Sequence, residues 1–443
     1  MGAPFGDAPS PVHDMISPNP SDPAPPRLVS DVPCPFCGLA CDDLAIEVAP
    51  SGVRVAANGC ARSRRMFGAS SPNGAPARIA GTPATLADAI AAAAAILRDA
   101  TQPVFAGLAT DVAGVRATLA LAERLGGVVD HLGSRALMRN VRVLQDRGAL
   151  TTTFAEVRNR ADLIVVAGTD VVSRFPRFFE RVAFGDAMFV HDREREVVFV
   201  GAQAVSESIA PRRHIRCDND ALGEVFGAVR ALCTGTMPAR AEVCGVPRPV
   251  LADLAQRMQN ARYGVLVWAA ADLDFPHADL AIDAIVACVS ALNERTRFSS
   301  LPLGGNEADV TANQVCLWQT GFPLRTSFAG GVAEHDADRY ALEALLAHDE
   351  IDALVWISSF DAALVPPSTR VPTLVLGRSG MSVAPAPAVQ IDVATPGLDQ
   401  AGHFFRGDAV VALRLQRIAR TDLPAAAAVV DRIAAAVERA RAC

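Results

Sequence analysis

The sequence contains no lysine, because all 41 basic residues among its 443 residues are arginine. A Walker-type phosphate loop, a pyridoxal-phosphate Schiff base and a protein-kinase active site each require a lysine amine. These three classes of enzyme are therefore excluded. The formal net charge of -7 also provides no basic field that would hold a phosphate backbone, so we expect no nucleic-acid partner.

Long apolar runs are missing as well. Hydrophobic residues make up 51% of the chain, which is typical of a globular protein, but stretches such as residues 87–97 fall short of the roughly 20 apolar residues in a membrane helix. Residues 1–30 are rich in proline and have no apolar segment behind a basic start, so they predict a disordered tail and no secretion signal. We expect a cytoplasmic protein that does not contact a membrane.

Helices and continuous apolar strands alternate along most of the chain. The clearest strands are predicted at residues 103–107, 162–168, 264–269, 353–358, 373–377 and 389–393, and the clearest helices at 85–98, 112–125 and 279–292. Apolar strands between helices imply mostly parallel sheets that are covered on both faces. We therefore predict an α/β protein with a small cysteine-rich domain at residues 31–70 and α/β domains at 71–240 and 241–443.

The sharpest local signal is a group of four cysteines near the N-terminus. Cys34, Cys37 and Cys41 are spaced closely along a glycine-containing loop, and Cys60 follows a hairpin predicted from the alternation of residues 44–56. Thiolates at this spacing can converge on one centre. Four of them suit a [4Fe-4S] cluster or a structural zinc, and an empty thiol-lined knuckle is the third alternative.

Other residues that could carry chemistry lack such a grouping. Cys233, Cys288 and Cys316 fall in apolar helical patterns and are predicted to be small buried side chains. The histidines are scattered without a metal-binding pair. Gly304, Gly305 and the following asparagine are predicted to form a tight turn, with an anion cradle as the alternative.

Residues 34–44, CPFCGLACDDL, resemble the N-terminal cluster motif of the B-type subunits in the formylmethanofuran dehydrogenase family, which are shortened relatives of the molybdopterin oxidoreductases. Further segments resemble that family in the same order along residues 31–443, namely 126–130, 156–170, 312–323, 354–359 and 397–408. The resemblance implies a molybdopterin oxidoreductase-like fold, in which a cysteine-rich cluster domain precedes α/β domains. It also favours iron at the four-cysteine site.

One departure from the family pattern changes the expected chemistry. In redox-active members, a cysteine followed by a histidine binds the metal a few residues after the strand that matches residues 128–130. This sequence has Ala136 and Leu137 at that place. No cysteine stands nearby, and Ser134 alone is a poor ligand for a soft metal. The resemblance therefore implies that a molybdenum or tungsten pterin is absent.

The resemblance implies the B-type subunit of the formyltransferase/hydrolase complex of methylotrophic and related bacteria. Other subunits of that complex move a formyl group from tetrahydromethanopterin to a methanofuran-like carrier and hydrolyse it to formate. We expect this chain to be a non-redox structural partner of the A-type, C-type and D-type subunits. Two alternatives are a redox-active formylmethanofuran dehydrogenase subunit with a metal pterin and a [4Fe-4S] cluster, and a stand-alone iron-sulfur electron-transfer protein.

Overall fold

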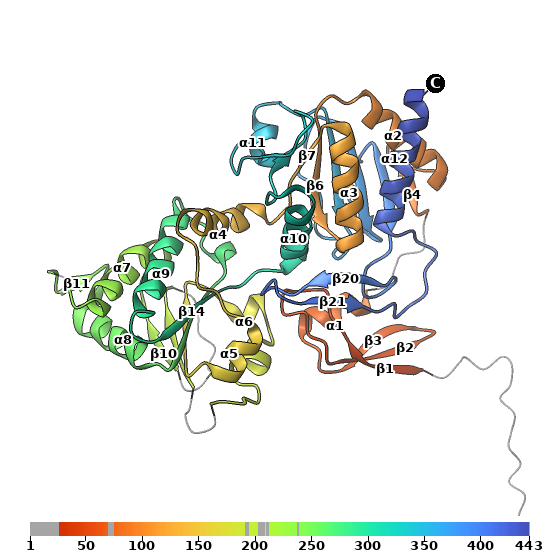
Figure 1. Cartoon of the computed structure of the whole chain (residues 1–443). Coiled ribbons are helices and arrows are strands. Elements are labelled where there is room, and N and C mark those ends of the chain that lie inside the picture. Colours follow the sequence, from red (N-terminus) through yellow and green to blue (C-terminus); the bar gives the residue numbers. More distant parts are fainter. Residues whose placement is uncertain are drawn as a thin grey trace, which may run out of the picture.

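The computed structural model describes residues 26–69, 75–190, 195–202, 209, 212–236 and 239–442. These residues form two α/β lobes and a smaller N-terminal unit, which Figure 1 shows below the larger lobe. The larger lobe is built on a nine-stranded mixed sheet and the smaller lobe on a five-stranded parallel sheet. The α/β architecture that the alternation of helices and apolar strands predicts is therefore confirmed.

The nine-stranded sheet of the larger lobe has the order β16-β15-β7-β6-β17-β18-β19-β4-β5. Its strands are β4 (Ala77–Ile79), β5 (Thr82–Pro83), β6 (Pro103–Ala109), β7 (Val128–Val129), β15 (Thr326–Ser327), β16 (Glu334–His335), β17 (Ala353–Ser358), β18 (Thr373–Arg378) and β19 (Val389–Val393). The central strands β7, β6, β17, β18 and β19 pair in parallel, and the outer strands pair antiparallel. The strands predicted at 353–358 and 389–393 have the predicted bounds.

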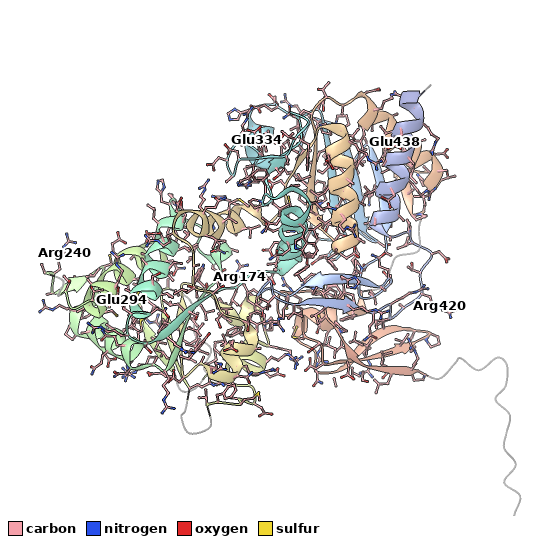
Figure 2. The ribbon with its side chains drawn as sticks, in the orientation of Figure 1. Arg174, Arg240, Glu294, Glu334, Arg420 and Glu438 are labelled. Atoms are coloured by element: carbon pink, nitrogen blue, oxygen red, sulfur yellow. The ribbon has the colours of Figure 1, made fainter. Side chains whose placement is uncertain are left out.

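Three helices cover one face of this sheet, and their buried side chains form the core of the larger lobe. They are α2 (Leu86–Asp99), α3 (Val112–Leu125) and α12 (Ala426–Ala442). The hydroxyl of Thr85 and the carboxylate of Asp111 accept hydrogen bonds from the first turns of α2 and α3, which is why both helices begin where the sequence predicts. Glu438 of α12, which is labelled in Figure 2, forms an ion pair with Arg124 of α3.

The opposite face of the same sheet is covered more thinly. The short helix α11 (Leu342–Ala347) and the loops that follow β17 and β18 pack there around Trp356 and Val375. At the junction with the smaller lobe, α10 (Asp309–Thr320) and the ribbon of β20 (Gly402–Phe405) and β21 (Ala412–Leu415) lie close together (Figure 1). Within the described part of the chain, no helix combines the length and apolar character needed to cross a bilayer.

The five-stranded sheet of the smaller lobe has the order β10-β9-β8-β13-β14, and all of its strands are parallel. The strands are β8 (Leu163–Ala167), β9 (Glu196–Val200), β10 (Arg212–Ile215), β13 (Tyr263–Trp268) and β14 (Arg297–Pro302). The α-helices of this lobe are α4 (Ser134–Arg147), α5 (Phe154–Arg160), α6 (Val171–Arg174), α7 (Leu222–Cys233), α8 (Arg248–Asn260) and α9 (Ala278–Leu292). Minor elements are η1 (Phe179–Ala183), η2 (Asn219–Ala221), η3 (Ala270–Asp272), β11 (Glu242–Val243) and β12 (Val246–Pro247).

The predicted boundary at residue 240 does not coincide with the division between the two sheets. The five-stranded sheet takes β8 to β10 from before this residue and β13 and β14 from after it, while the nine-stranded sheet takes strands from both ends of the chain. The smaller lobe is thus inserted into the larger one. The order of strands along the chain could not reveal this, because β8 pairs with β13 about 100 residues later (Leu163 opposite Gly264).

The N-terminal unit is a three-stranded antiparallel sheet followed by one helix. Its elements are β1 (Arg27–Val32), β2 (Leu44–Ala49), β3 (Gly52–Ala57) and α1 (Ala61–Gly68). The predicted hairpin of residues 44–56 is confirmed. Residues 27–30, predicted to belong to a disordered tail, instead form part of β1, which pairs with β2 and has Arg27 opposite Val48. The rest of that predicted tail, residues 1–25, lies outside the described residues.

Candidate functional site

The N-terminal unit packs against the carboxyl ends of the strands in the larger lobe. The strand order of this sheet reverses between β6 and β17, and such a switch point opens a crevice at the carboxyl ends of parallel strands. Phe36 lies at this place, with its ring edge-on to the ring of Phe360. The buried guanidinium of Arg378 donates hydrogen bonds to the carbonyl of Phe360 and to that of Met66 in α1. The crevice is thus filled by the protein itself.

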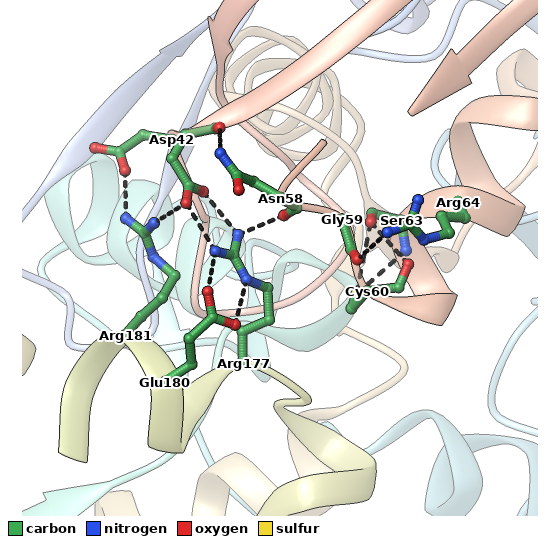
Figure 3. Close-up of polar contacts among 10 residues, drawn as sticks. Asp42, Asn58, Gly59, Cys60, Ser63, Arg64, Arg177, Glu180 and Arg181 are labelled. Atoms are coloured by element: carbon green, nitrogen blue, oxygen red, sulfur yellow. Dashed lines mark hydrogen bonds and ion pairs between the residues drawn. The ribbon is translucent and has the colours of Figure 1, made fainter. Parts of the chain in front are cut away.

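The cysteine loop, residues 34–41, is closed by its own backbone. The N–H of Cys34 donates to the carbonyl of Cys41 at 2.8 Å, and the N–H of Ala40 donates to the carbonyl of Cys37 at 3.0 Å. The three cysteines of this loop are only 5–6% exposed. Cys60 is half-buried at the start of α1, where its sulfur accepts a hydrogen bond from the N–H of Ser63 at 3.4 Å (Figure 3).

The four predicted ligand cysteines share one neighbourhood. Burial raises the pKa of Cys37 to about 11 and that of Cys41 to about 12. Burial also raises the pKa of Cys34, and the like charges of Cys37, Cys41 and Cys60 raise it further. Among the described residues, however, no three cysteine, histidine, aspartate or glutamate side chains stand in an arrangement that could hold a metal ion. The four-cysteine metal site therefore stays a prediction.

Two arginines of the smaller lobe, Arg177 and Arg181, hold the N-terminal unit in place, and we call them the arginine clamp (Figure 3). The guanidinium of Arg177 is buried and donates to both carboxylate oxygens of Asp43 at 2.7 Å, and also to the carbonyl of Asn58. Arg181 forms a 2.6 Å ion pair with Asp42. Burial raises the pKa of Asp43, but the hydrogen bonds from Arg177 and the charges of both arginines outweigh burial and lower it.

Glycines from three distant segments meet beside the cysteine loop and form what we call the glycine junction, which consists of Gly38, Gly304, Gly305 and Gly407. The N–H of Gly407 donates to the carbonyl of Gly38 at 2.7 Å. A β-carbon added to Gly407 would lie 2.3 Å from the carbonyl oxygen of Gly304. The Asn306 side chain accepts a hydrogen bond from the N–H of Gly38 at 3.1 Å. Only residues without a side chain allow these backbones to approach so closely.

The turn predicted at Gly304 and Gly305 continues into an unusual backbone. Gly305 has φ 88°, and the next residues of the short helix η4 (Asn306–Ala308) include Glu307 with φ 53° and Ala308 with φ 67°. Non-glycine residues rarely occupy this left-handed region, and such strain persists only where the surroundings impose it. Strained turns of this kind occur often at binding sites, which makes the loop after β14 a candidate for function.

His131 holds the strained turn from the larger lobe. Its Nδ1 accepts a hydrogen bond from the N–H of Gly133 at 2.8 Å, so Nε2 carries the proton and donates to the carbonyl of Glu307 at 2.9 Å. Burial lowers the pKa of His131 to about 4, against the opposing effect of the Glu307 carbonyl. The imidazole is therefore neutral at pH 7. The sequence did not single out His131, because the histidines are scattered along the chain. The feature that could have identified it is its position directly after β7 and Asp130.

An interdomain cavity of about 270 Å³ opens between the two lobes, beside α4, α9 and α10. Ala136 and Leu137, which occupy the position of the family's metal-binding pair, line it. The buried carboxyl of Asp309, whose pKa burial raises to about 7, also lines it. The hydroxyl of Ser300 is buried in its wall and has no hydrogen-bond partner among the described residues.

The described lining of the interdomain cavity includes carboxylate, amide and hydroxyl groups but no cysteine or histidine. A metal pterin that is ligated by a protein thiolate requires a cysteine, and the described lining has none. The residues of the cavity therefore do not fit a thiolate-ligated metal pterin.

Comparisons with known proteins show that the chain is similar to two related kinds of protein. No protein-family model matches it. The B-type subunit of the tungsten-containing formylmethanofuran dehydrogenase 2 of Methanocaldococcus jannaschii is 26% identical over 410 residues, which cover 87% of this chain and 92% of that protein. The corresponding protein of Methanococcus maripaludis is 23% identical over 87% of this chain and 92% of its own length.

Bacterial relatives belong to a complex of different activity. The B-type subunit of the formyltransferase/hydrolase complex of Methylorubrum extorquens is 28% identical over 326 residues, 72% of this chain and 84% of that protein. A chain from the crystal structure of this complex with methylofuran matches with a TM-score of 0.71 at 26% identity, over 83% of this chain and 100% of that chain. The homologues of this protein are therefore the B-type subunits of formylmethanofuran dehydrogenase and of the formyltransferase/hydrolase complex.

Proposed function

We propose that this chain is the B-type subunit of a formyltransferase/hydrolase complex and works in one-carbon oxidation to formate, linked to tetrahydromethanopterin. Its partners are the A-type, C-type and D-type subunits of that complex. The proposal is supported by the similarity to the corresponding protein of the Methylorubrum extorquens complex in sequence and in fold. In this role the chain is a structural partner of catalytic subunits and performs no redox step itself.

One observation supports the non-redox role above all others. Ala136 and Leu137 line the interdomain cavity at the place where redox-active relatives are expected to bind the metal. A methyl group and an isobutyl group have no lone pair to donate. The oxygen and amide groups elsewhere in the described lining are ligands for hard cations, so they do not replace the missing thiolate.

A second candidate function is a redox-active role within a formylmethanofuran dehydrogenase. It is favoured by the extent of the match, because the two tungsten-containing relatives match 87% of this chain and the relative from the bacterial complex 72%. The lining of the interdomain cavity opposes this candidate.

The cysteine loop adds a proposal about structure. A metal centre bound there would be held by Cys34, Cys37, Cys41 and Cys60, and it would cross-link the loop to α1. The N-terminal unit is too small to form a large core of its own, so such a cross-link would stabilise it together with the packing against the larger lobe. An iron-sulfur cluster could also transfer electrons, although the proposed function does not require it.

The test is to co-produce this chain with the A-type, C-type and D-type subunits and to analyse the purified complex for metals. We expect a stable complex, because a structural partner of this kind forms obligate interfaces, which bury at least about 2,000 Å². We also expect this complex to contain molybdenum and tungsten far below one atom per chain. Stoichiometric molybdenum or tungsten would establish the redox-active alternative instead. A chain that purifies as a stable monomer in the presence of all three partners would refute both complexes and favour a stand-alone iron-sulfur protein.

A further inference from the structure

β19 carries polar side chains on the face of the nine-stranded sheet that also carries Trp356 and Val375. Successive side chains of a strand point to opposite faces, and the odd-numbered residues of β19 pack into the core with α2 and α12. Gln390 and Asp392 therefore point to the other face, where Val375 stands in register with Gln390 and Trp356 in register with Val375. Both polar side chains are buried, so they need polar partners within the protein.

These side chains line a second cavity, of about 360 Å³, which we call the edge cavity because it lies beside β4 near the edge of the sheet. Arg78 of β4 stands directly opposite Gln390 in the antiparallel pair and also faces the cavity. The loop of residues 379–383 closes another side, and its Met381 carbonyl accepts a 2.9 Å hydrogen bond from the Gln390 amide. The cavity is separate from the cysteine loop and from the interdomain cavity.

Asp392 is incompletely bonded in this cavity. The residue is 5% exposed, and its Oδ1 has no hydrogen-bond partner among the described residues. Arg78 Nη1 lies 3.6 Å from this oxygen, which allows an ionic attraction but is too long for a hydrogen bond. Leaving a buried acceptor without a hydrogen bond is unfavourable, because the group has lost its hydration. Burial raises the pKa of Asp392, while the Ser379 hydroxyl, Arg78 and Gln390 oppose this rise.

The size and charge of the edge cavity restrict what could satisfy Asp392. A water molecule occupies roughly 30 Å³ in the liquid, so the cavity has room for a molecule larger than one water. A cation would be repelled by Arg78 and an anion by Asp392, since both charges face the same space. A neutral molecule with a hydrogen-bond donor beside an acceptor meets both residues without a charge penalty.

We propose that the edge cavity binds a small neutral molecule with a lactam or cyclic-urea group. Its N–H donates to Asp392 Oδ1, and its carbonyl oxygen accepts from the Arg78 guanidinium. The inference does not depend on the proposed function, because neither Asp392 nor Arg78 belongs to the cysteine loop or to the interdomain cavity.

The experiment measures binding of three small probes to the full chain by saturation-transfer NMR. 2-Imidazolidinone is a cyclic urea, guanidinium is a cation of similar shape, and acetate is an anion. We expect binding of 2-imidazolidinone and at least about tenfold weaker binding of the two ions, because a lost hydrogen-bond partner costs about that much. Equal binding of either ion, or no binding of any probe, would overturn the proposal.

Two variants test the roles of the residues through a change of selectivity. Asp392→Asn leaves the Arg78 charge alone and replaces the charged acceptor by a weaker neutral amide oxygen, so acetate binding should appear and 2-imidazolidinone binding should fall. Arg78→Gln leaves the Asp392 charge and should favour guanidinium instead. Arg98→Gln, which removes an exposed arginine paired with Asp99 on α2, is the control and should bind like the unmodified chain.

Cooperative thermal unfolding shows whether each variant is folded. If Asp392→Asn does not fold, Arg78→Gln decides, because the Arg78 side chain is 31% exposed and its loss disturbs the core less. Unchanged probe selectivity in a folded Arg78→Gln variant would contradict the assignment.

Discussion

A β-carbon added to Gly38 would lie 1.8 Å from the carbonyl oxygen of Gly304. The cysteine loop and the turn after β14 thus touch backbone to backbone, although 266 residues separate the two glycines in the chain. The strained residues of η4 follow this contact directly, and His131 holds them from the other side. The position of the cysteine loop and the shape of the turn therefore depend on each other.

Replacing Gly38 by alanine should destabilise the protein. The obstructing atom belongs to the backbone, so the loop or the turn must shift, and overpacking of this kind costs about 1–3 kcal/mol. Urea unfolding of the two proteins measures the difference. Gly227→Ala in α7 is the matched control, since nothing lies within 4 Å of its added β-carbon and alanine should stabilise the helix by about 0.5–1 kcal/mol. Equal stability of Gly38→Ala and the parent would disprove the tight contact.

The arginine clamp should make stability depend on pH through Asp43. The pKa of Asp43 is lowered in the folded protein, so its contribution is present above the unfolded pKa of about 3.9 and is lost as pH falls through the folded value. The destabilisation caused by Asp43→Asn should thus be full at pH 7 and shrink below about pH 4. Asp99→Asn, at a fully exposed ion pair, should have a small effect at either pH. A constant penalty for Asp43→Asn at pH 7 and pH 3 would contradict the clamp.

His131 should produce a pH dependence in a different range. Its folded pKa of about 4 lies below the unfolded value of about 6.5, so the unfolded chain binds the additional proton between these values. Stability should therefore fall as pH decreases from about 6.5 towards 4, with a slope of up to about 1.4 kcal/mol per pH unit. In the His131→Asn variant, stability should no longer fall with pH in this range. The control variant His348→Asn replaces an exposed histidine and should keep the pH dependence. Unfolding free energies at pH 7, 6 and 5 provide the measurement.

The predicted metal site can be tested at Cys37. If a cluster or zinc is bound, Cys37→Ala should lose the metal, loosen residues 31–68 towards proteases and lower the yield of complex, because the N-terminal unit has little core of its own. Cys244→Ala removes an exposed cysteine of the smaller lobe and should change none of these. Anaerobic absorption near roughly 400 nm reports iron-sulfur charge transfer, and elemental analysis reports zinc. A preparation with neither signal would leave a metal-free thiol knuckle.

Local patterns in the sequence predict most of the secondary structure. β17 has its predicted bounds because it is an apolar run that ends at a serine, whereas in β19 the apolar residues alternate with Gln390 and Asp392. α3 has its predicted bounds because Asp111 caps its start and Gly126, with φ 71°, ends it. Cys233, Cys288 and Cys316 are buried, as their helical patterns predict.

Relationships between distant segments could not be predicted in the same way. Nothing in the residues around Arg177 distinguishes it from a surface arginine, and only the fold brings it to Asp43. Gly407 looks like any loop glycine until Gly304 and Gly38 surround it. The cysteine spacing predicts one site, and in the structure the charges of Cys37, Cys41 and Cys60 act on Cys34. The spacing contains no information about whether the four sulfurs converge on a metal.

The insertion of one lobe into the other affects the order in which the chain can fold during synthesis. All strands of the smaller lobe are available once β14 has emerged from the ribosome, so its sheet can form early. β6 must wait, because Pro103 pairs with Ala353 of β17. Until then its apolar edge has no neighbour on that side, and unpaired edges of this kind promote aggregation. The nascent chain should therefore depend most on chaperones after β14 emerges and before β17 does.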